Sequence, residues 1–341
     1  PLHPRGRLLS LRMEDAATLD PPGDADLLAC VSEALERDGR ESARARAAER
    51  LRAAVAANRS AVRERLESGE ADGRDGAREL AAGVDRVVRS ALDVARLLHP
   101  NPTPTQGERL SVAAVGGYGR AEMAPFSDVD LLFVRPWKQT AWGESLIETA
   151  LYLLWDLKLK VGHAVRTPDE CLRLAKSDVT IRTALLEKRF LWGDPAPLAT
   201  LDARLWSELF EKSGPEFVEA KLAERTRRHQ RNGGSRYLVE PNVKESKGGL
   251  RDLQTLYWIA KYLYHADDTA ALVERGVFTA EEVAAFDAAE RFLWTVRLHL
   301  HYIAGRAQES LSFDLQVEAA EAMGYAARGG QRGVERFMQD Y

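Results

Sequence analysis

The sequence predicts a mixed α/β fold, in the α+β sense, with a short stranded core between two helical flanks. Two apolar runs, residues 111–115 and 129–134, are rich in Val, Ala and Leu and are closed by glycine and by proline, as expected of buried strands. The segments on both sides carry apolar residues at the spacing of amphipathic helices. A length of 341 residues leaves room for two domains or three small ones.

The composition narrows the class of protein. A hydrophobic content of 45% and a charged content of 29% are typical of a globular protein in solution. The net charge of −4 argues against a broad nucleic-acid surface. Cys30 and Cys171 are too few for a disulfide framework or a cysteine zinc site. Without a long apolar run or a signal-peptide core, we expect no membrane partner and a cytoplasmic location, and the start at Pro1 suggests a fragment.

The first hundred residues are predicted to be an arm followed by helices. Residues 1–23 mix Pro, Gly, Arg and Asp without a period, and we expect them to be flexible. Beyond them, two amphipathic helices are separated near Gly39, and a third is stopped by Pro100. Their Arg and Glu runs are most simply solvated helix faces with i,i+4 pairs.

The most informative stretch is residues 110–134, which read as strand, glycine turn, short crossover and second strand. Asp128 and Asp130 are separated by one apolar residue, so both point to the same face of a strand with Cα atoms roughly 7 Å apart. Two like charges there are costly unless a cation neutralises them. The N–H groups of Gly116 and Gly117 can line an anion nest, and Arg120 can grip a phosphate in two places.

These residues together predict a metal and nucleotide site. Mg²⁺, with Mn²⁺ as an alternative, would lie between the carboxylates and a nucleoside triphosphate on the glycine turn, an arrangement that suits in-line attack on phosphorus. Taken singly, a Gly-Gly pair is usually only a turn, and an Asp-x-Asp is usually a solvated edge. No Gly-Lys-Ser/Thr follows, so this is not a Walker loop.

The segments after the second strand alternate between helix and strand. We expect a helix over residues 142–160, in which Tyr152 and Trp155 either pack or serve as base-stacking platforms, a short strand over 161–166, and one capped helix over 177–194. His163 is either a base or metal neighbour or a hydrogen-bonded structural residue. Asp156 is either a further metal ligand or a solvated helix residue.

The C-terminal half is predicted to be helical. The basic end of a helix over residues 215–231 either is solvated or faces a triphosphate or an acidic partner. A loop with Lys244 leads into a helix that begins at Leu250, where the adjacent glycines and lysines either form an anion site or, taken alone, only cap the helix. Another helix is bounded by Thr279 and Gly305. The core positions expected for the helix from Leu250 are Leu253, Leu256, Tyr257 and Ile259.

Two stretches carry a family resemblance. GGYGRAEMAPFSDVDLLFV resembles the nucleotidyltransferase motif of the DNA polymerase beta superfamily and, more narrowly, the bacterial PII uridylyltransferase/uridylyl-removing enzymes. PNVKESKGGLRDLQ is similar to a second segment of that family, with Lys247 where a proline is more typical. The resemblance implies a polymerase beta-like nucleotidyltransferase core with helical N-terminal and C-terminal flanks. The implied parts are a flexible arm (1–23), N-terminal helices (24–100), a nucleotidyltransferase domain (101–195) and a helical uridylyltransferase-associated domain (196–341).

The resemblance also implies a reaction. UMP would move from UTP to a tyrosine of the PII nitrogen-regulatory protein, with release of pyrophosphate, and Asp128 and Asp130 would hold Mg²⁺. Asn242, Lys244 and Arg251 would contact the nucleotide, together with Gly116, Gly117 and Arg120. The superfamily often has a third acid on the next strand, and this sequence has none there. Uridylyl removal and glutamine sensing are predicted to be absent from this polypeptide. Adenylyl transfer to glutamine synthetase and a non-catalytic module that binds nucleotide or PII remain alternatives.

Overall fold

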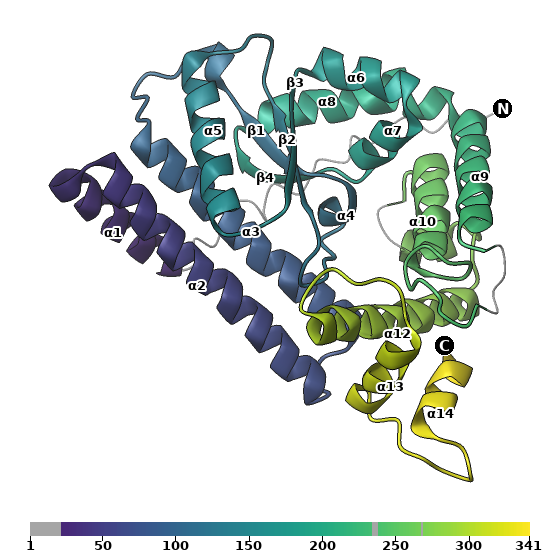
Figure 1. Cartoon of the computed structure of the whole chain (residues 1–341). Coiled ribbons are helices and arrows are strands. Elements are labelled where there is room, and N and C mark those ends of the chain that lie inside the picture. The colour runs from purple at the N-terminus through teal and green to yellow at the C-terminus, as the bar shows by residue number, and fades with distance from the viewer. Residues whose placement is uncertain (1–21, 234–237, 267–268) are drawn as a thin grey trace.

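The structure is a computed structural model that describes residues 22–233, 238–266 and 269–341. It confirms the mixed α/β fold, with one four-stranded sheet among helices (Figure 1). The predicted flexible arm falls almost wholly on residues 1–21, which lie outside the described residues. Within the described ranges, no helix combines the length and apolar character needed to cross a membrane.

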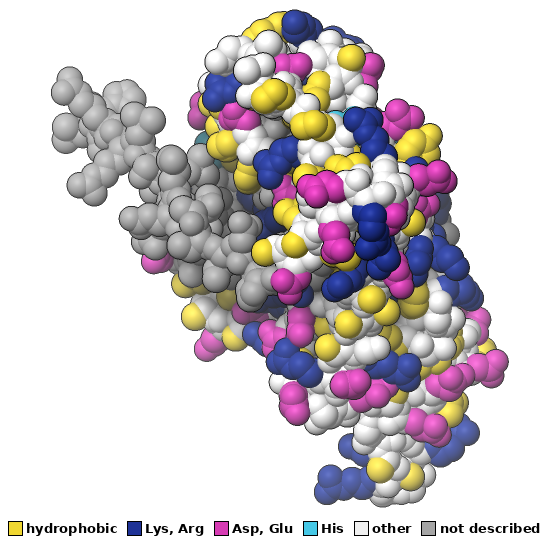
Figure 2. Space-filling model, turned by 90° about the vertical axis from the view of Figure 1, so that its left-hand side faces the viewer, with side chains coloured by type: hydrophobic (Ala, Val, Ile, Leu, Met, Phe, Trp, Pro, Cys, Tyr) yellow, Lys and Arg dark blue, Asp and Glu magenta, His cyan; other side chains and the backbone are white. Residues whose placement is uncertain are grey.

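The N-terminal flank forms three helices, as predicted. Gly39 separates the first two with a φ of 84°, a backbone conformation that glycine adopts without steric penalty. Asp72 caps the third by accepting hydrogen bonds from two backbone N–H groups of its first turn. Figure 2 shows that both signs of charge are interspersed on the side of the molecule that lies to the left in Figure 1. The helices are α1 (Pro22–Asp38), α2 (Arg40–Glu67) and α3 (Gly73–Leu98).

The sheet has the strand order β3-β2-β1-β4. The central pair, β1 and β2, runs antiparallel, and β2 pairs with β3 in parallel. The predicted crossover between the first two strands is therefore wrong, because an apolar run indicates a strand but not its direction. A single helical turn, α4 (Gly116–Gly119), begins the connection instead. The strands are β1 (Ser111–Ala114), β2 (Val129–Val134), β3 (Val161–Arg166) and β4 (Arg189–Gly193).

The fourth strand was not predicted. The single helix expected over residues 177–194 is wrong, because α7 (Val179–Leu186) ends early and β4 then pairs antiparallel with β1. At the start of this strand, Arg189 donates two hydrogen bonds of 2.6 and 3.0 Å to the Asp85 carboxylate of α3. Contacts with segments far away in the sequence thus decide the conformation of this stretch.

The two faces of the sheet pack against different helices. Leu131 and Phe133 join a core with α3 and α5 (Ala141–Asp156), whereas Leu132 and Val134 face a second core. Because side chains alternate along a strand, Asp130 shares the face of Leu132. Helices α6 (Pro168–Ser177), α7 and α8 (Pro195–Glu208) supply the second core.

The C-terminal flank is helical, as predicted, and Thr279 and Gly305 bound its longest helix. In α10 the core prediction is wrong: Leu256 is exposed and Leu253, Tyr257 and Ile259 are only half-buried. Apolar residues occur around most of this helix, so spacing alone does not select its buried face, which contains Leu250, Gln254, Trp258 and Tyr262. The helices are α9 (Gly214–Arg231), α10 (Leu250–Tyr264), α11 (Thr269–Glu274), α12 (Ala280–Ala304), α13 (Phe313–Ala322) and α14 (Gly333–Asp340).

A close crossing of α3 and α12 joins the two flanks. A Cβ added at Gly73 would lie only 1.9 Å from the backbone nitrogen of Thr295, so the backbones meet where glycine has no side chain. The Gly73 N–H also donates a 2.9 Å hydrogen bond to Thr295 Oγ1. Next to this contact, Arg74 lies 3.1 Å from Asp287 and 3.2 Å from Glu290 of α12. The two flanks are thus locked together at this crossing.

Candidate active site

Asp128 and Asp130 lie at the N-terminal end of β2. Asp128 directly precedes the strand and is exposed, whereas Asp130 is half-buried within it. Strand alternation fixes the face of Asp130 only, because Asp128 lies outside β2, and Asp128 is not among the residues that line the cleft around Asp130. Neither carboxylate forms an ion pair or a side-chain hydrogen bond with another described residue. Burial, and secondly the Asp128 charge, raise the pKa of Asp130, while the Lys244 ammonium opposes that rise.

Two glycines flank the Asp130 carboxylate. A Cβ built at Gly116, whose φ is 59°, would lie 3.5 Å from Asp130 Oδ2, and one built at Gly162 would lie 2.5 Å from Oδ1. Gly162 is the register partner of Asp130 on β3. The carboxylate therefore lies between the glycine turn and the edge strand, in a space that a side chain at position 162 would fill.

Asp130 lines a cleft of about 590 Å³ between the sheet and helices α7, α9 and α10. This volume is within the usual range for small-molecule sites. Five cationic side chains line the cleft and outnumber its acids, so it suits a polyanionic ligand that also carries a cation on the acids. The cationic residues are Arg120, Lys221, Arg228, Arg231 and Arg251, and the acidic ones are Asp130, Glu187, Glu224 and Glu245.

The indole ring of Trp258 lies next to three of these cationic side chains. Lys221 Nζ lies 4.1 Å from the centre of the indole ring, and the guanidinium carbons of Arg251 and Arg120 lie at 5.4 and 5.8 Å. These distances are within the range of cation–π attraction. Neither Lys221 nor Trp258 could be predicted from the sequence, because each reaches the cleft only through the packing of α9 and α10 on the sheet.

The structure brings four of the predicted nucleotide residues to the cleft: Gly116, Gly117, Arg120 and Arg251. The Arg120 guanidinium does not have all its N–H groups available for a phosphate, because its Nη1 donates a 2.6 Å hydrogen bond to the buried Glu187 carboxylate. Gly117 lies beside this guanidinium, since an added Cβ would be 3.6 Å from Arg120 Nη2. The glycine turn and the cationic wall are thus adjacent.

The loop before α10 is placed less directly. The side-chain oxygen of Asn242 accepts hydrogen bonds from the backbone N–H groups of Lys244 (3.0 Å) and Glu245 (2.8 Å), so it shapes the loop rather than lining the cleft. Lys244 is half-buried, and burial, followed by the charges of Arg297 and Arg251, lowers its pKa. Lys244 does not line the cleft, although its positive charge opposes the rise in the pKa of Asp130.

The basic end of α9 was predicted either to be solvated or to face a ligand, and its arginines differ in this respect. Arg228 and Arg231 line the cleft, whereas Arg225 and Arg227 do not. The Arg228 side chain forms an ion pair with Asp252 of α10 and lies 3.8 Å from Glu245. This end of the helix therefore faces the cleft in part and is solvated in part.

The two other candidates lie away from the carboxylate pair. His163 is the register partner of Leu131, so it lies on the opposite face of the sheet from Asp130 and is not its neighbouring base or ligand. Asp156 forms a 3.2 Å ion pair with Arg44 at the end of α5, as a solvated helix residue does. Within the described ranges, no group of three His, Cys, Asp or Glu residues is arranged to hold a metal ion.

Comparisons with known proteins agree on one family. Residues 216–341 match the family model described as GlnD PII-uridylyltransferase. The chain is 57% identical to a bifunctional uridylyltransferase/uridylyl-removing enzyme of Cereibacter sphaeroides, over 88% of the chain and 32% of that protein. The corresponding enzyme of Ruegeria pomeroyi is 62% identical over 75% of the chain and 28% of its own length. That of Bradyrhizobium diazoefficiens is 49% identical over 97% and 36%. The chain thus spans about a third of the length of these relatives.

Proposed function

Sequence similarity places this chain in the PII-uridylyltransferase family, and from that premise we propose that the cleft transfers UMP from UTP to a tyrosine hydroxyl of the PII nitrogen-regulatory protein, releasing pyrophosphate. One observation carries the proposal. Asp128 and Asp130 have no ion-pair partner among the described residues, and Asp130 lines a cleft with five cationic side chains. A divalent cation held by these acids would thus lie next to a polyphosphate bound by the cationic side chains.

The carboxylate pair fits Mg²⁺. Magnesium prefers oxygen ligands and is commonly bound by one or two carboxylates together with substrate phosphates, so a two-acid site is sufficient. Asp128 and Asp130 would hold the ion, with Mn²⁺ as an alternative. When bound, the ion supplies charge neutralisation and alignment for in-line displacement at phosphorus.

The remaining groups of the cleft would bind and orient the nucleotide. Gly116 and Gly117 permit the backbone to approach the phosphates closely. Lys221 and Arg251 present positive charge from α9 and α10 to the cleft that Asp130 also lines. Arg120, which Glu187 holds in one orientation, adds a charge with little freedom of movement. Preorganised charge of this kind stabilises the transition state more than mobile charge does.

Substitution of Asp130 tests the proposal. Asp130→Asn keeps the shape of the side chain and removes its charge, and we expect UMP incorporation into PII from labelled UTP to fall by at least about 10²-fold. Asp156→Asn is the matched control, because it makes the same chemical change at an exposed residue paired with Arg44. It is expected to transfer UMP at the parental rate. Equal incorporation by the two variants refutes the catalytic role.

Among the described residues, no third acid joins Asp128 and Asp130 in a metal-binding group, and this favours one other reading, a module that binds nucleotide or PII without turnover. Tight binding of Mg–UTP in calorimetry without any release of pyrophosphate would select it. Adenylyl transfer to glutamine synthetase is separated from uridylyl transfer by competition between ATP and UTP in the same labelling assay.

A further inference from the structure

The edge of the sheet nearest to Asp130 carries an additional inference. We propose that the protein substrate docks on the outer edge of β3, where an extended segment that bears the acceptor tyrosine adds to the sheet as a further strand. This inference rests on the proposed function, because the docked tyrosine would receive UMP at the same pair of carboxylates. Strand addition is a common mode of peptide recognition, in which backbone hydrogen bonds give affinity and side-chain pockets give specificity.

The outer edge of β3 offers unused backbone groups. The N–H groups of Val129 and Arg135 donate to the carbonyls of Lys160 (2.8 Å) and Arg166 (3.0 Å). These bonds identify which alternate residues of β3 pair with β2. Alternate residues of β3 bond to β2, so the N–H and C=O groups of Val161, His163 and Val165 point away from the sheet. Across the ranges that the structure describes, no strand pairs with this edge.

The geometry connects this edge with the carboxylates. Neighbouring strands are about 4.8 Å apart, so an added strand would lie roughly 10 Å from β2. A tyrosine side chain spans roughly 6 Å from Cα to its hydroxyl, judged from standard bond lengths. A tyrosine on the Asp130 face of the added strand therefore extends over Gly162, which has no side chain to obstruct it. Its hydroxyl would end beside Asp130, because Gly162 is the register partner of that residue.

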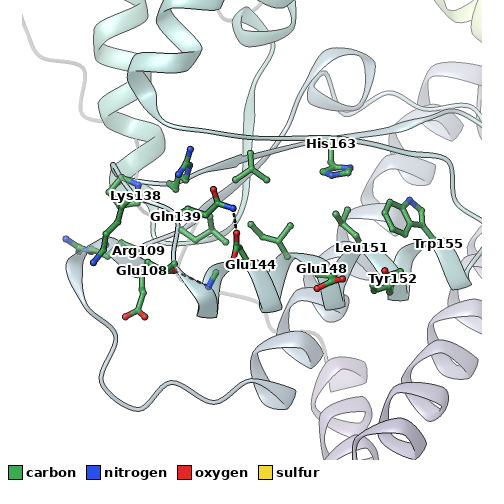
Figure 3. A pocket seen from close by; sticks show the side chains of 18 residues that line it. Glu108, Arg109, Lys138, Gln139, Glu144, Glu148, Leu151, Tyr152, Trp155 and His163 are labelled. Atoms are coloured by element: carbon green, nitrogen blue, oxygen red, sulfur yellow. Dashed lines mark hydrogen bonds between the residues drawn. The ribbon is translucent and has the colours of Figure 1, made fainter.

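The opposite face of the edge strand offers a groove for neighbouring side chains. Figure 3 shows His163 above Tyr152 and Trp155 of α5, within a cavity of about 490 Å³. These two aromatic residues are 44% and 42% exposed and pack edge-on against each other, with ring centroids 5.6 Å apart. Since side chains alternate along a strand, a tyrosine facing Asp130 would have its two neighbours facing this groove. The end of the groove formed by Tyr152 and Trp155 therefore suits apolar residues on either side of the acceptor.

The charge of the β3 edge indicates which kind of segment would bind there. Residues 157–167 contain Lys158, Lys160 and Arg166 and no Asp or Glu. Both lysines are exposed. An acidic segment complements this edge, and attraction between the two surfaces raises the rate of encounter. The inferred occupant is thus an extended, acidic segment of the protein substrate, with a tyrosine flanked by apolar residues.

A proline substitution tests strand addition. Val165→Pro removes an N–H that points outward, so it breaks no bond to β2, and proline is tolerated on edge strands. Val165→Thr is the matched control, because it retains the N–H and is also β-branched. With the full 341-residue chain, PII and UTP, we expect Val165→Pro to raise the KM for PII at least tenfold, whereas the KM for UTP stays at the parental value. Equal KM values for PII in the two variants overturn the docking mode.

If Val165→Pro also loses UTP binding through misfolding, amide hydrogen exchange in the unsubstituted chain tests strand addition instead. Selective ¹⁵N labelling of valine and histidine reports Val161, His163 and Val165 at the edge, with Val129 as a control inside the sheet. Saturating PII is expected to slow exchange at the three edge amides at least tenfold and to leave Val129 unchanged. Unchanged exchange at the edge refutes the inference. If the unsubstituted chain transfers no UMP to PII, the proposed function fails instead.

Discussion

Gly162→Ala is the sharpest test of how Asp130 is held in place. The added Cβ would lie 2.5 Å from Asp130 Oδ1. That separation is roughly 1 Å shorter than a favourable contact, so the carboxylate or the edge strand must move by about that distance. A misplacement of about 1 Å can cost about 10²-fold in rate. The loss of stability should be smaller, about 1 kcal/mol, because the strand lies at an open edge and can adjust.

The assay measures kcat for UMP transfer at saturating UTP and PII, together with the free energy of unfolding in urea. Gly214→Ala is the matched control, since its Cβ would lie 2.9 Å from Leu263 Cδ2, the flexible end of a side chain far from the carboxylates. We expect about a 10²-fold lower kcat for Gly162→Ala and a nearly parental kcat for Gly214→Ala. A parental kcat for Gly162→Ala, or an equal fall in both variants, would refute the reasoning.

Three further predictions concern stability and are checked by urea unfolding. Burial, with the Glu122 charge, raises the pKa of Glu290 to about 7 from its ordinary 4.5, so the folded chain holds an extra proton between these pH values. Its free energy of unfolding should fall as pH rises through that window, and Glu290→Gln should abolish this dependence. Asp85→Ala leaves the Arg189 guanidinium without its carboxylate partner and should cost about 3 kcal/mol. Asp72→Ala removes the cap of α3 and should cost about 1 kcal/mol.

Local signals in the sequence predicted much of the fold. The strand at Val129–Val134 has the predicted limits, because an apolar run closed by proline leaves little freedom. Gly39, Thr279 and Gly305 mark helix boundaries for reasons contained within a few residues.

Features that depend on distant contacts could not be predicted in this way. β4 forms because it pairs with β1, and the role of Trp258 depends on three cations from different segments. The placement of His163 on the far face of the sheet required the register with β2. The residue opposite Asp130 is a glycine, and nothing in the local sequence marks that position as special.

The crossing of α3 and α12 at Gly73 has a consequence for how ligands enter. α3 packs under the sheet, and α12 also contacts α10, which carries part of the cationic wall. Two backbones in direct contact cannot move apart or slide past one another without losing that contact. The opposing walls of the cleft therefore keep their separation before any substrate binds. Binding should accordingly require little reorganisation of the two halves, and most of its ordering should fall on the incoming molecules.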